Sequence, residues 1–382
     1  MVVLALVAVV IVLSLVAGGS DDGDPAAAST TTTTTRPSPS RPGPPSRPRV
    51  PGSADEPGPV LAEDVRLDPV LGMAIVSVRG PGATVTVADL ATGAELVLGE
   101  GLPTGASQGI WWTGSTLVSR SNNGSVYRLE AGPPGAWVRL DTTEFDPVWP
   151  GVDDLVHLWG TESSQPGSHY GVLEPDGTIA RHVLPPGAQE PPVGVVDGSL
   201  VVNTGDGIYL LDPSGQARRH ALGTALGVSH GRLVRRTCDE VLVCRLFLDD
   251  LVNGTSVDVG TVDAGRAVRR ALPAPDGSAV ALVLAADGEL RLAVHPLPSG
   301  PELSWRIGSL WSDPYMLQWA PDSSGLAWIE GERWSVGAVV LDGDERPEPA
   351  SVRLAQPVGS GGVVATFLVP RTSLPEDWRP VN

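Results

Sequence analysis

The sequence of 382 residues contains no lysine, only two cysteines, six histidines and few aromatic side chains other than tryptophan. All 26 basic residues are therefore arginines, against 44 acids, and the formal net charge is −18. This balance excludes nucleic acid as a partner, because neutralising phosphates needs a basic surface. A GC-rich bacterial genome, such as that of an actinomycete, explains the missing lysine codons.

The scarcity of histidine and cysteine excludes several kinds of site. No two histidines have the spacing of a zinc-protease motif, and two cysteines are too few for a structural zinc site. No glycine-rich loop leads into a helix, so a nucleotide site has no support. We therefore expect neither a metal ion nor another cofactor.

Cys238 and Cys244 lie on either side of a turn expected at Asp239 and Glu240. In an exported protein, two cysteines at this spacing favour a disulfide, which would contribute about 2 kcal/mol by closing a small loop. The alternative is a pair of free thiols.

One long apolar run opens the chain. Residues 2–17 are apolar apart from Ser14, and as a helix residues 1–19 would reach about 28 Å, close to the thickness of a bilayer core. We predict a single-pass signal anchor that leaves the rest of the chain outside the cytoplasm, since no basic residue directly follows the run. A signal peptide cleaved near Ala17 is the alternative, and the protein would then be secreted. No cysteine closes the run, which argues against a lipoprotein.

Residues 20–60 are rich in threonine, serine and proline, including six consecutive threonines from Thr30. This segment has too few apolar residues to form a core, so we predict a disordered, extended linker. It holds five acids and four arginines, which leaves residues 61–382 with a net charge of −17.

A tight turn between two apolar segments recurs about every 42 residues after the linker. The turns lie near Gly72, Gly114, Asp154, Gly198, Gly231, Gly277 and Gly325. A second turn follows within several units, at residues 89–93, 175–177, 212–215 and 250–254. Four strands and two marked turns per unit predict an all-β protein, a β-propeller of seven four-stranded blades, with six or eight blades as alternatives. The propeller would span residues 61–372 and be followed by a C-terminal tail, 373–382.

Closure of the ring is the weakest part of this prediction. The first unit has a poor leading strand near residues 65–70, whereas residues 363–369 form a late apolar segment. This late segment either completes the first blade, which leaves no exposed sheet edge, or begins a further blade.

Two units carry a sharper signature, Ala274-Pro275-Asp276-Gly277 and Trp319-Ala320-Pro321-Asp322. Both resemble the Trp-Ser-Pro-Asp-Gly pattern of the TolB-like and WD-type β-propeller superfamily. The resemblance implies the fold, and it implies a binding platform outside the cytoplasm, because families of this type act mostly in that way. No catalytic residue of such a family matches this chain.

Residues 227–231 and 105–109 match the G-x-S-x-G pattern of a hydrolase nucleophile elbow. The elbow needs a turn from a strand into a helix, whereas residues 232–234 continue as an apolar strand. We therefore interpret both matches as coincidence in a chain rich in glycine and serine.

One group of residues supports a binding hypothesis. Tryptophans and acids gather near the expected first strands of consecutive blades, at Trp111, Trp112, Trp149, Asp153, Asp154 and His157. Tryptophan rings beside carboxylates are common in sugar and peptide sites. The alternative is that the tryptophans fill the gaps between blades.

The sequence therefore predicts a membrane-tethered binding or scaffold module whose partner is another envelope protein or a cell-wall glycan. The alternative is a glycan-active hydrolase or lyase that uses the mouth of the propeller, for which Asp153 and Asp154 are the only support. The sequence does not decide whether the protein is an enzyme, although a non-catalytic role is favoured.

Overall fold

The structure, a computed structural model, describes a limited set of residues. These are residues 60–62, 66–79, 83–101, 109–113, 116–121, 125–130, 135–142, 148–150, 156–161, 168–173, 178–188, 192–241, 243–262, 266–286, 289–298, 300–307, 317–330, 335–341, 347–355 and 363–380. The predicted N-terminal helix and linker lie outside them. Within the described residues, no helix is long and apolar enough to cross a membrane.

The described strands form seven four-stranded antiparallel sheets. In order from the inner to the outer strand, the sheets are β28 (Val363–Pro370), β1 (Met73–Arg79), β2 (Thr84–Asp89), β3 (Glu95–Gly99); β4 (Gly109–Trp112), β5 (Leu117–Arg120), β6 (Ser125–Leu129), β7 (Trp137–Thr142); β8 (Val148–Pro150), β9 (Val156–Thr161), β10 (Ser168–Leu173), β11 (Ile179–Val183); β12 (Gly194–Val196), β13 (Ser199–Thr204), β14 (Gly207–Leu211), β15 (Ala217–Ala221); β16 (Thr224–Ser229), β17 (Arg232–Cys238), β18 (Cys244–Asp250), β19 (Thr255–Val262); β20 (Ala267–Pro273), β21 (Ala279–Ala286), β22 (Glu289–Pro296), β23 (Leu303–Ile307); and β24 (Leu317–Trp319), β25 (Gly325–Glu330), β26 (Ser335–Val340), β27 (Ala350–Arg353).

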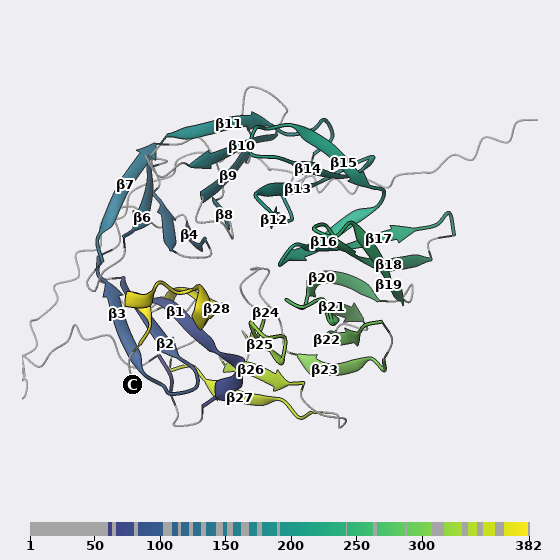
Figure 1. Cartoon of the computed structure of the whole chain (residues 1–382). Coiled ribbons are helices and arrows are strands. Elements are labelled where there is room, and N and C mark those ends of the chain that lie inside the picture. Colours follow the sequence, from purple (N-terminus) through teal and green to yellow (C-terminus); the bar gives the residue numbers. More distant parts are fainter. Residues whose placement is uncertain are drawn as a thin grey trace, which may run out of the picture. The chain divides into compact units, whose positions relative to one another are not determined.

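The sheets are arranged as the blades of a β-propeller, with the first strand of each sheet innermost and the fourth outermost (Figure 1). The expected all-β propeller with four-stranded blades is therefore confirmed. Short 3₁₀-helices, η1 (Pro69–Leu71), η3 (Arg371–Ser373) and η4 (Glu376–Trp378), flank the first blade.

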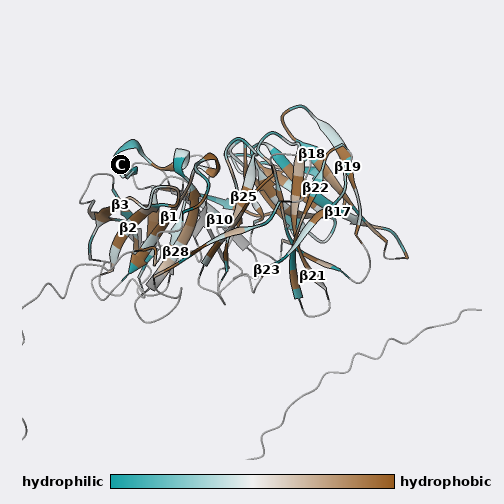
Figure 2. Cartoon of the chain, turned by 90° about the horizontal axis from the view of Figure 1, so that it is seen from below, coloured by the Kyte–Doolittle hydropathy of each residue, from teal (hydrophilic) through white to brown (hydrophobic). Residues whose placement is uncertain are grey.

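The core of the propeller lies between the blades. Each hydrophobic cluster joins residues of two neighbouring sheets, and together the clusters fill every seam around the ring. Strands such as β1 and β21 are apolar along most of their length (brown in Figure 2), because both faces of a blade pack against another blade. Burial of these faces supplies the main stabilisation of the fold.

The first blade is closed by the two ends of the propeller. β28 pairs with β1 through a register that runs from Met73 opposite Pro370 to Arg79 opposite Val363. Of the two interpretations of the late apolar segment, completion of the first blade is confirmed. No strand forms among the described residues 66–72, where η1 and Gly72 lead into β1.

The tail after β28 packs onto the propeller. Leu374 and Trp378 are buried in the cluster between the first blade and the blade of β4–β7. Arg371 also pairs with the buried Asp89 at 2.8 Å. Residues 371–378 therefore add to the core of the seam that they cover.

Acidic side chains fix the turns that join third and fourth strands. In three blades the first residue of the turn is an aspartate, Asp89, Asp212 or Asp250, and its Oδ1 accepts two backbone N–H bonds from the same turn. Aspartate favours such turns because its short side chain can mimic a backbone acceptor. The expected second turn is confirmed at these positions.

Candidate functional site

The structure places the first two residues that the sequence grouped as a binding site in two different seams. Trp111 and Trp112 lie next to each other on β4 and point into different seams. Trp112 is only 1% exposed, and its ring centroid lies 6.2 Å from that of Trp378. Half-buried Trp111 packs beside Val118 in the opposite seam. Both positions agree with the interpretation that tryptophans fill the gaps between blades.

The remaining predicted residues are only partly described. Trp149 on β8 and His157 on β9 are directly opposite each other in the strand register. Asp153 and Asp154 lie outside the described residues. A ligand-binding role for this group stays a prediction.

A pocket that the sequence did not reveal lies at the carboxyl ends of four neighbouring first strands, β16, β20, β24 and β28. Its volume is about 180 Å³, and we call it the inner-strand pocket. It is lined by Ser229, His230, Leu272, Gln318, Trp319, Pro321, Pro370, Thr372 and Ser373. Leu272, Trp319 and the prolines are apolar, whereas the other lining groups offer hydroxyl, amide and imidazole atoms.

Tight turns position this lining. His230 and Gly231 form the two-residue turn between β16 and β17, with φ angles of 49° and 74°. Two left-handed residues give a hairpin turn whose twist matches the strands, which explains a glycine at the second position. The turn directs the Ser229 and His230 side chains toward the pocket.

The two Ala-Pro-Asp turns follow β20 and β24, two of the strands that line the site, and Pro321 of the second turn is itself a lining residue. In each turn an aspartate Oδ1 accepts the backbone N–H two residues later, from Ser278 to Asp276 at 2.8 Å and from Ser324 to Asp322 at 3.0 Å. A left-handed residue follows each aspartate, Gly277 in one turn and Ser323 in the other. The repeated motif therefore codes for the same local structure in both blades.

Hydrogen bonds connect these turns across the blades. The Trp319 indole N–H donates to the Leu272 carbonyl at 2.9 Å, and Arg232 donates to the Pro275 carbonyl at 2.6 Å. The backbone N–H of Asp276 donates to the Ser323 hydroxyl at 3.1 Å. The pocket is thus built on a connected frame rather than on independent loops.

The electrostatics of the pocket are close to neutral. Of the residues that the structure describes, no acid, lysine or arginine lines it. Desolvation by the surrounding protein, and secondly the charge of Arg232, lower the pKa of His230 below its usual value. His230 is therefore neutral at pH 7.

Ser229 and His230 do not form a hydrolase site. The Ser229 Oγ lies 2.6 Å from His230 Nδ1, but the chain continues into β17 and not into a helix. Within the described residues, no acid is hydrogen-bonded to His230 to orient its ring. This G-x-S-x-G match therefore lies in a strand–turn–strand and not in the strand–turn–helix of a nucleophile elbow.

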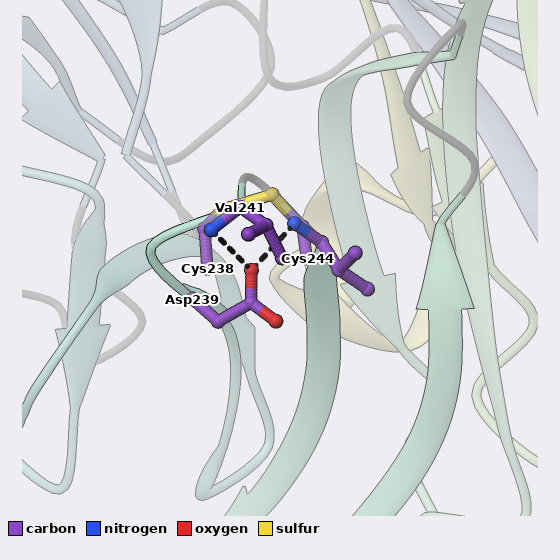
Figure 3. Close-up of a disulfide and its surroundings, with 5 residues drawn as sticks. Cys238, Asp239, Val241 and Cys244 are labelled. Carbon is purple, nitrogen blue, oxygen red and sulfur yellow. Dashed lines mark hydrogen bonds between the residues drawn. A yellow bond between two sulfur atoms is a disulfide. The ribbon is translucent and has the colours of Figure 1, made fainter.

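The expected disulfide joins Cys238 to Cys244, which are paired residues at the ends of β17 and β18 (Figure 3). Asp239 Oδ1 accepts the N–H groups of Val241 and Val243 at 3.0 and 2.8 Å and so fixes the turn between them. Val241 is 77% exposed at the tip. The bond therefore holds an exposed hairpin end, distant in sequence from the tail residues that complete the pocket.

Groups of histidine, cysteine and acids arranged to hold a metal ion are not found within the described residues. The inner-strand pocket itself offers one imidazole and no carboxylate, which is a poor ligand set for a metal ion. Its chemistry is hydrogen bonding to an uncharged polar group beside an apolar surface.

Comparison with known proteins identifies general likenesses only. No family model matches the chain, and no curated protein matches its sequence. Similar solved structures include Hsv2 of Kluyveromyces lactis, with 16% identity, 62% of this chain and 74% of that chain covered, and a TM-score of 0.44. A putative 6-phosphogluconolactonase of Bacteroides fragilis is 11% identical over 78% of this chain and 98% of its own, with a TM-score of 0.46. TolB of Acinetobacter baumannii is 16% identical over 78% and 67%, with a TM-score of 0.43.

TolB is thus among the structures similar to this chain, in agreement with the resemblance of the two Ala-Pro-Asp motifs. Likenesses of this strength carry no argument about function. The propeller fold rests on the strand pairing described above.

Sequence reasoning missed the pocket because its lining comes from distant segments. Ser229 and Ser373 are separated in the sequence by the rest of the β16–β19 blade and by two further blades, and they meet only because β28 returns to the first blade. Two local patterns fall on the pocket, the Trp319-Ala320-Pro321-Asp322 motif and the turn at residues 227–231, and each contributes two lining residues.

Proposed function

We propose that the protein is a non-catalytic binding module, held outside the cytoplasm by residues 1–19, that recognises a cell-envelope ligand in the inner-strand pocket. The observation that supports this proposal is the pocket lining, in which uncharged polar groups surround an apolar surface at the ends of four first strands. Such pockets, apolar with a few placed polar groups, are the usual form of a ligand site.

The size of the pocket narrows the ligand. About 180 Å³ is less than the roughly 300–1,000 Å³ of sites that enclose a whole drug-sized molecule. One sugar ring or one polar side chain fits this space better than a cofactor. An uncharged sugar unit of a cell-wall glycan also matches the neutral lining, because its hydroxyls can pair with Gln318, Thr372 and His230.

A hydrolase or lyase function receives no support from this pocket. Glycoside hydrolysis in most families needs two carboxyl groups on either side of the scissile bond. Among the described residues, no acid lines the pocket. Captured glycan should therefore be recovered without a change in chain length.

The test is a pull-down with the full chain from its own envelope, followed by mass spectrometry of the captured glycans and proteins. We expect a glycan to be retained, and Gln318→Ala to weaken its binding about tenfold through the loss of one half-buried hydrogen-bond partner. The exposed Gln216, on the turn before β15, offers the matched control Gln216→Ala, which should bind normally. Equal binding by both variants would contradict the proposed site, and a stoichiometric protein without glycan would contradict the proposed ligand.

The tryptophan hypothesis is tested in the same assay. Trp149→Ala should weaken glycan binding if the ligand extends across the ring to β8. Normal binding by folded Trp149→Ala together with loss in Gln318→Ala would restrict the site to the inner-strand pocket.

A further inference from the structure

A second cavity lies on the outer side of the propeller, between the blade of β12–β15 and the blade of β16–β19. Its volume is about 280 Å³. We call it the rim groove, and its polar lining is Arg218, His220, Arg235, Asp249, Asp250, Thr255 and Ser256. It is formed by the outer strands β15 and β19 with β17 and β18, so it shares no lining residue with the inner-strand pocket.

A buried carboxylate organises the groove. Asp249 is 4% exposed, and its Oδ2 accepts a hydrogen bond from Arg235 Nε at 2.6 Å and lies 3.1 Å from His220 Nε2. Its Oδ1 accepts from the Ser256 hydroxyl at 2.6 Å. A buried charge must be paired in this way to be stable. Both oxygens of Asp249 are thus occupied by groups of the protein.

The second acid at the groove is also occupied. Asp250 accepts backbone N–H bonds from Val252 and Asn253 and a side-chain bond from Asn253, and its Oδ2 lies 3.7 Å from Arg232. The two carboxylates therefore have partners of their own, and arginines compensate their charge. Little acceptor capacity is left for a ligand.

Donors, in contrast, remain available. The side chain of Arg218 makes no hydrogen bond or ion pair within the described part of the chain, although it lines the groove. Arg235 donates from Nε to Asp249 and from one terminal nitrogen to the Ser256 hydroxyl at 3.4 Å, and its guanidinium is held over the Phe247 ring at 4.3 Å. Most of its five N–H groups have neither of these partners. Two guanidinium groups, one of them rigidly placed, thus face a cavity in which the acceptors are already satisfied.

We propose that the rim groove binds an oxyanion, the carboxylate or phosphate group of a ligand, through Arg218 and Arg235. The planar guanidinium matches both groups because it can donate two parallel hydrogen bonds to two oxygens. The −17 charge of residues 61–382 does not forbid this, since exposed charges more than about 8–10 Å away are screened at physiological salt. The Thr255 hydroxyl adds a further donor at the edge of the groove.

The first experiment uses the native full chain and measures how fast each arginine is modified by phenylglyoxal, with peptide mass spectrometry as the readout. Inorganic phosphate and acetate are added in separate arms, each compared with chloride at equal ionic strength. We expect Arg218 to be protected severalfold, whereas the exposed Arg291 on β22 is not. Protection of Arg218 by phosphate alone supports a phosphate ligand, and protection by acetate alone supports a carboxylate. An Arg218 rate that neither anion lowers relative to chloride, or lowers no more than that of Arg291, overturns the proposal.

A variant pair gives an independent check. Arg218→Ala should weaken binding of the protecting anion at least about tenfold, the effect expected for losing one charge-assisted contact. Arg291→Ala removes the same charge from an exposed position on another strand, β22, and should leave the affinity within about twofold. Equal affinities of the two variants would overturn the assignment. Glycan capture by the inner-strand pocket should not change in either variant, so failure here is distinguishable from failure of the proposed function.

Discussion

Two seams of the same propeller are built in opposite ways. Between the blades of β20–β23 and β24–β27 the contact is apolar from the inner strands out to the rim, where Trp305 and Ile307 of β23 are both buried. Between the blades of β12–β15 and β16–β19 the apolar contact ends at residues such as Leu210 and Leu233. Beyond it lie the charged side chains of the rim groove.

The difference arises from the outer strand of the blade that comes first in the sequence at each seam, β23 in one seam and β15 in the other. β23 has the sequence Leu-Ser-Trp-Arg-Ile, in which alternate residues are apolar and face the next blade. β15 has the sequence Ala-Arg-Arg-His-Ala, which supplies no large apolar side chain. A seam without such side chains cannot be filled by packing, so ion pairs and a cavity take their place. The comparison shows that one strand of five residues decides whether a seam is part of the core or a potential site.

The largest effect is expected from breaking the apolar seam. Trp305→Ala should lower the free energy of unfolding by about 3–5 kcal/mol, because it leaves a cavity among close-packed residues. His220→Ala, at the corresponding place in the polar seam, should cost about 1 kcal/mol, the value of a typical hydrogen bond at a half-exposed site. Urea unfolding of both variants measures the difference, and equal losses would contradict the distinction between the seams.

The sequence predicts the turns and the inner strands of the blades better than it predicts the side chains that meet at the outer ends of the seams. Turn residues such as Asp250, Gly231 and Gly277 act within a few positions of themselves, so the strand count per blade and the placement of hairpins follow from local patterns. The apolar faces of the inner strands follow from the same patterns.

The sites themselves could not be predicted in this way. Arg218 and Asp249 come from different blades and become neighbours only when β15 packs beside β18. In the sequence, Arg218 is one of 26 arginines in a chain that also has 44 acids, so nothing marks it as special. Trp112 illustrates the opposite error, because a residue that looked suited to a ligand is buried against Trp378.

The next effect concerns the centre of the polar seam. Asp249→Ala should destabilise the protein by about 2–3 kcal/mol, because Arg235 would lose its buried partner, although water can partly replace it. Asp258→Asn removes a charge from an exposed pair with Arg245 on the same blade and should cost under about 0.5 kcal/mol. Chemical denaturation measures both changes. A loss for Asp249→Ala no greater than that for Asp258→Asn would mean that the ion cluster does not hold the seam.

The disulfide between β17 and β18, in one of the two blades of the polar seam, is expected to contribute slightly less to stability. Replacing both Cys238 and Cys244 by serine should lower the free energy of unfolding by about 2 kcal/mol, the value expected from closing a loop of this length. The double variant is compared with the wild type under oxidising and reducing conditions. Reduction should bring the wild type to the stability of the variant, whereas a wild type that is insensitive to reductant would show that the bond does not contribute.

The smallest effect concerns the turns of the apolar seam at low pH. The hydrogen bond from the Ser324 hydroxyl, together with that from the Ser324 backbone, lowers the pKa of Asp322. A carboxyl whose pKa is lower in the folded state than the unfolded value of about 3.9 stabilises the fold above that pH, and this contribution is lost as the pH falls through the folded pKa.

Because Asp322 is exposed, we expect less than about 1 kcal/mol from this source. Asp322→Asn should therefore flatten the pH dependence of stability below about pH 4. Identical acid unfolding curves for Asp322→Asn and the wild type would show that this turn contributes nothing to the stability of the apolar seam.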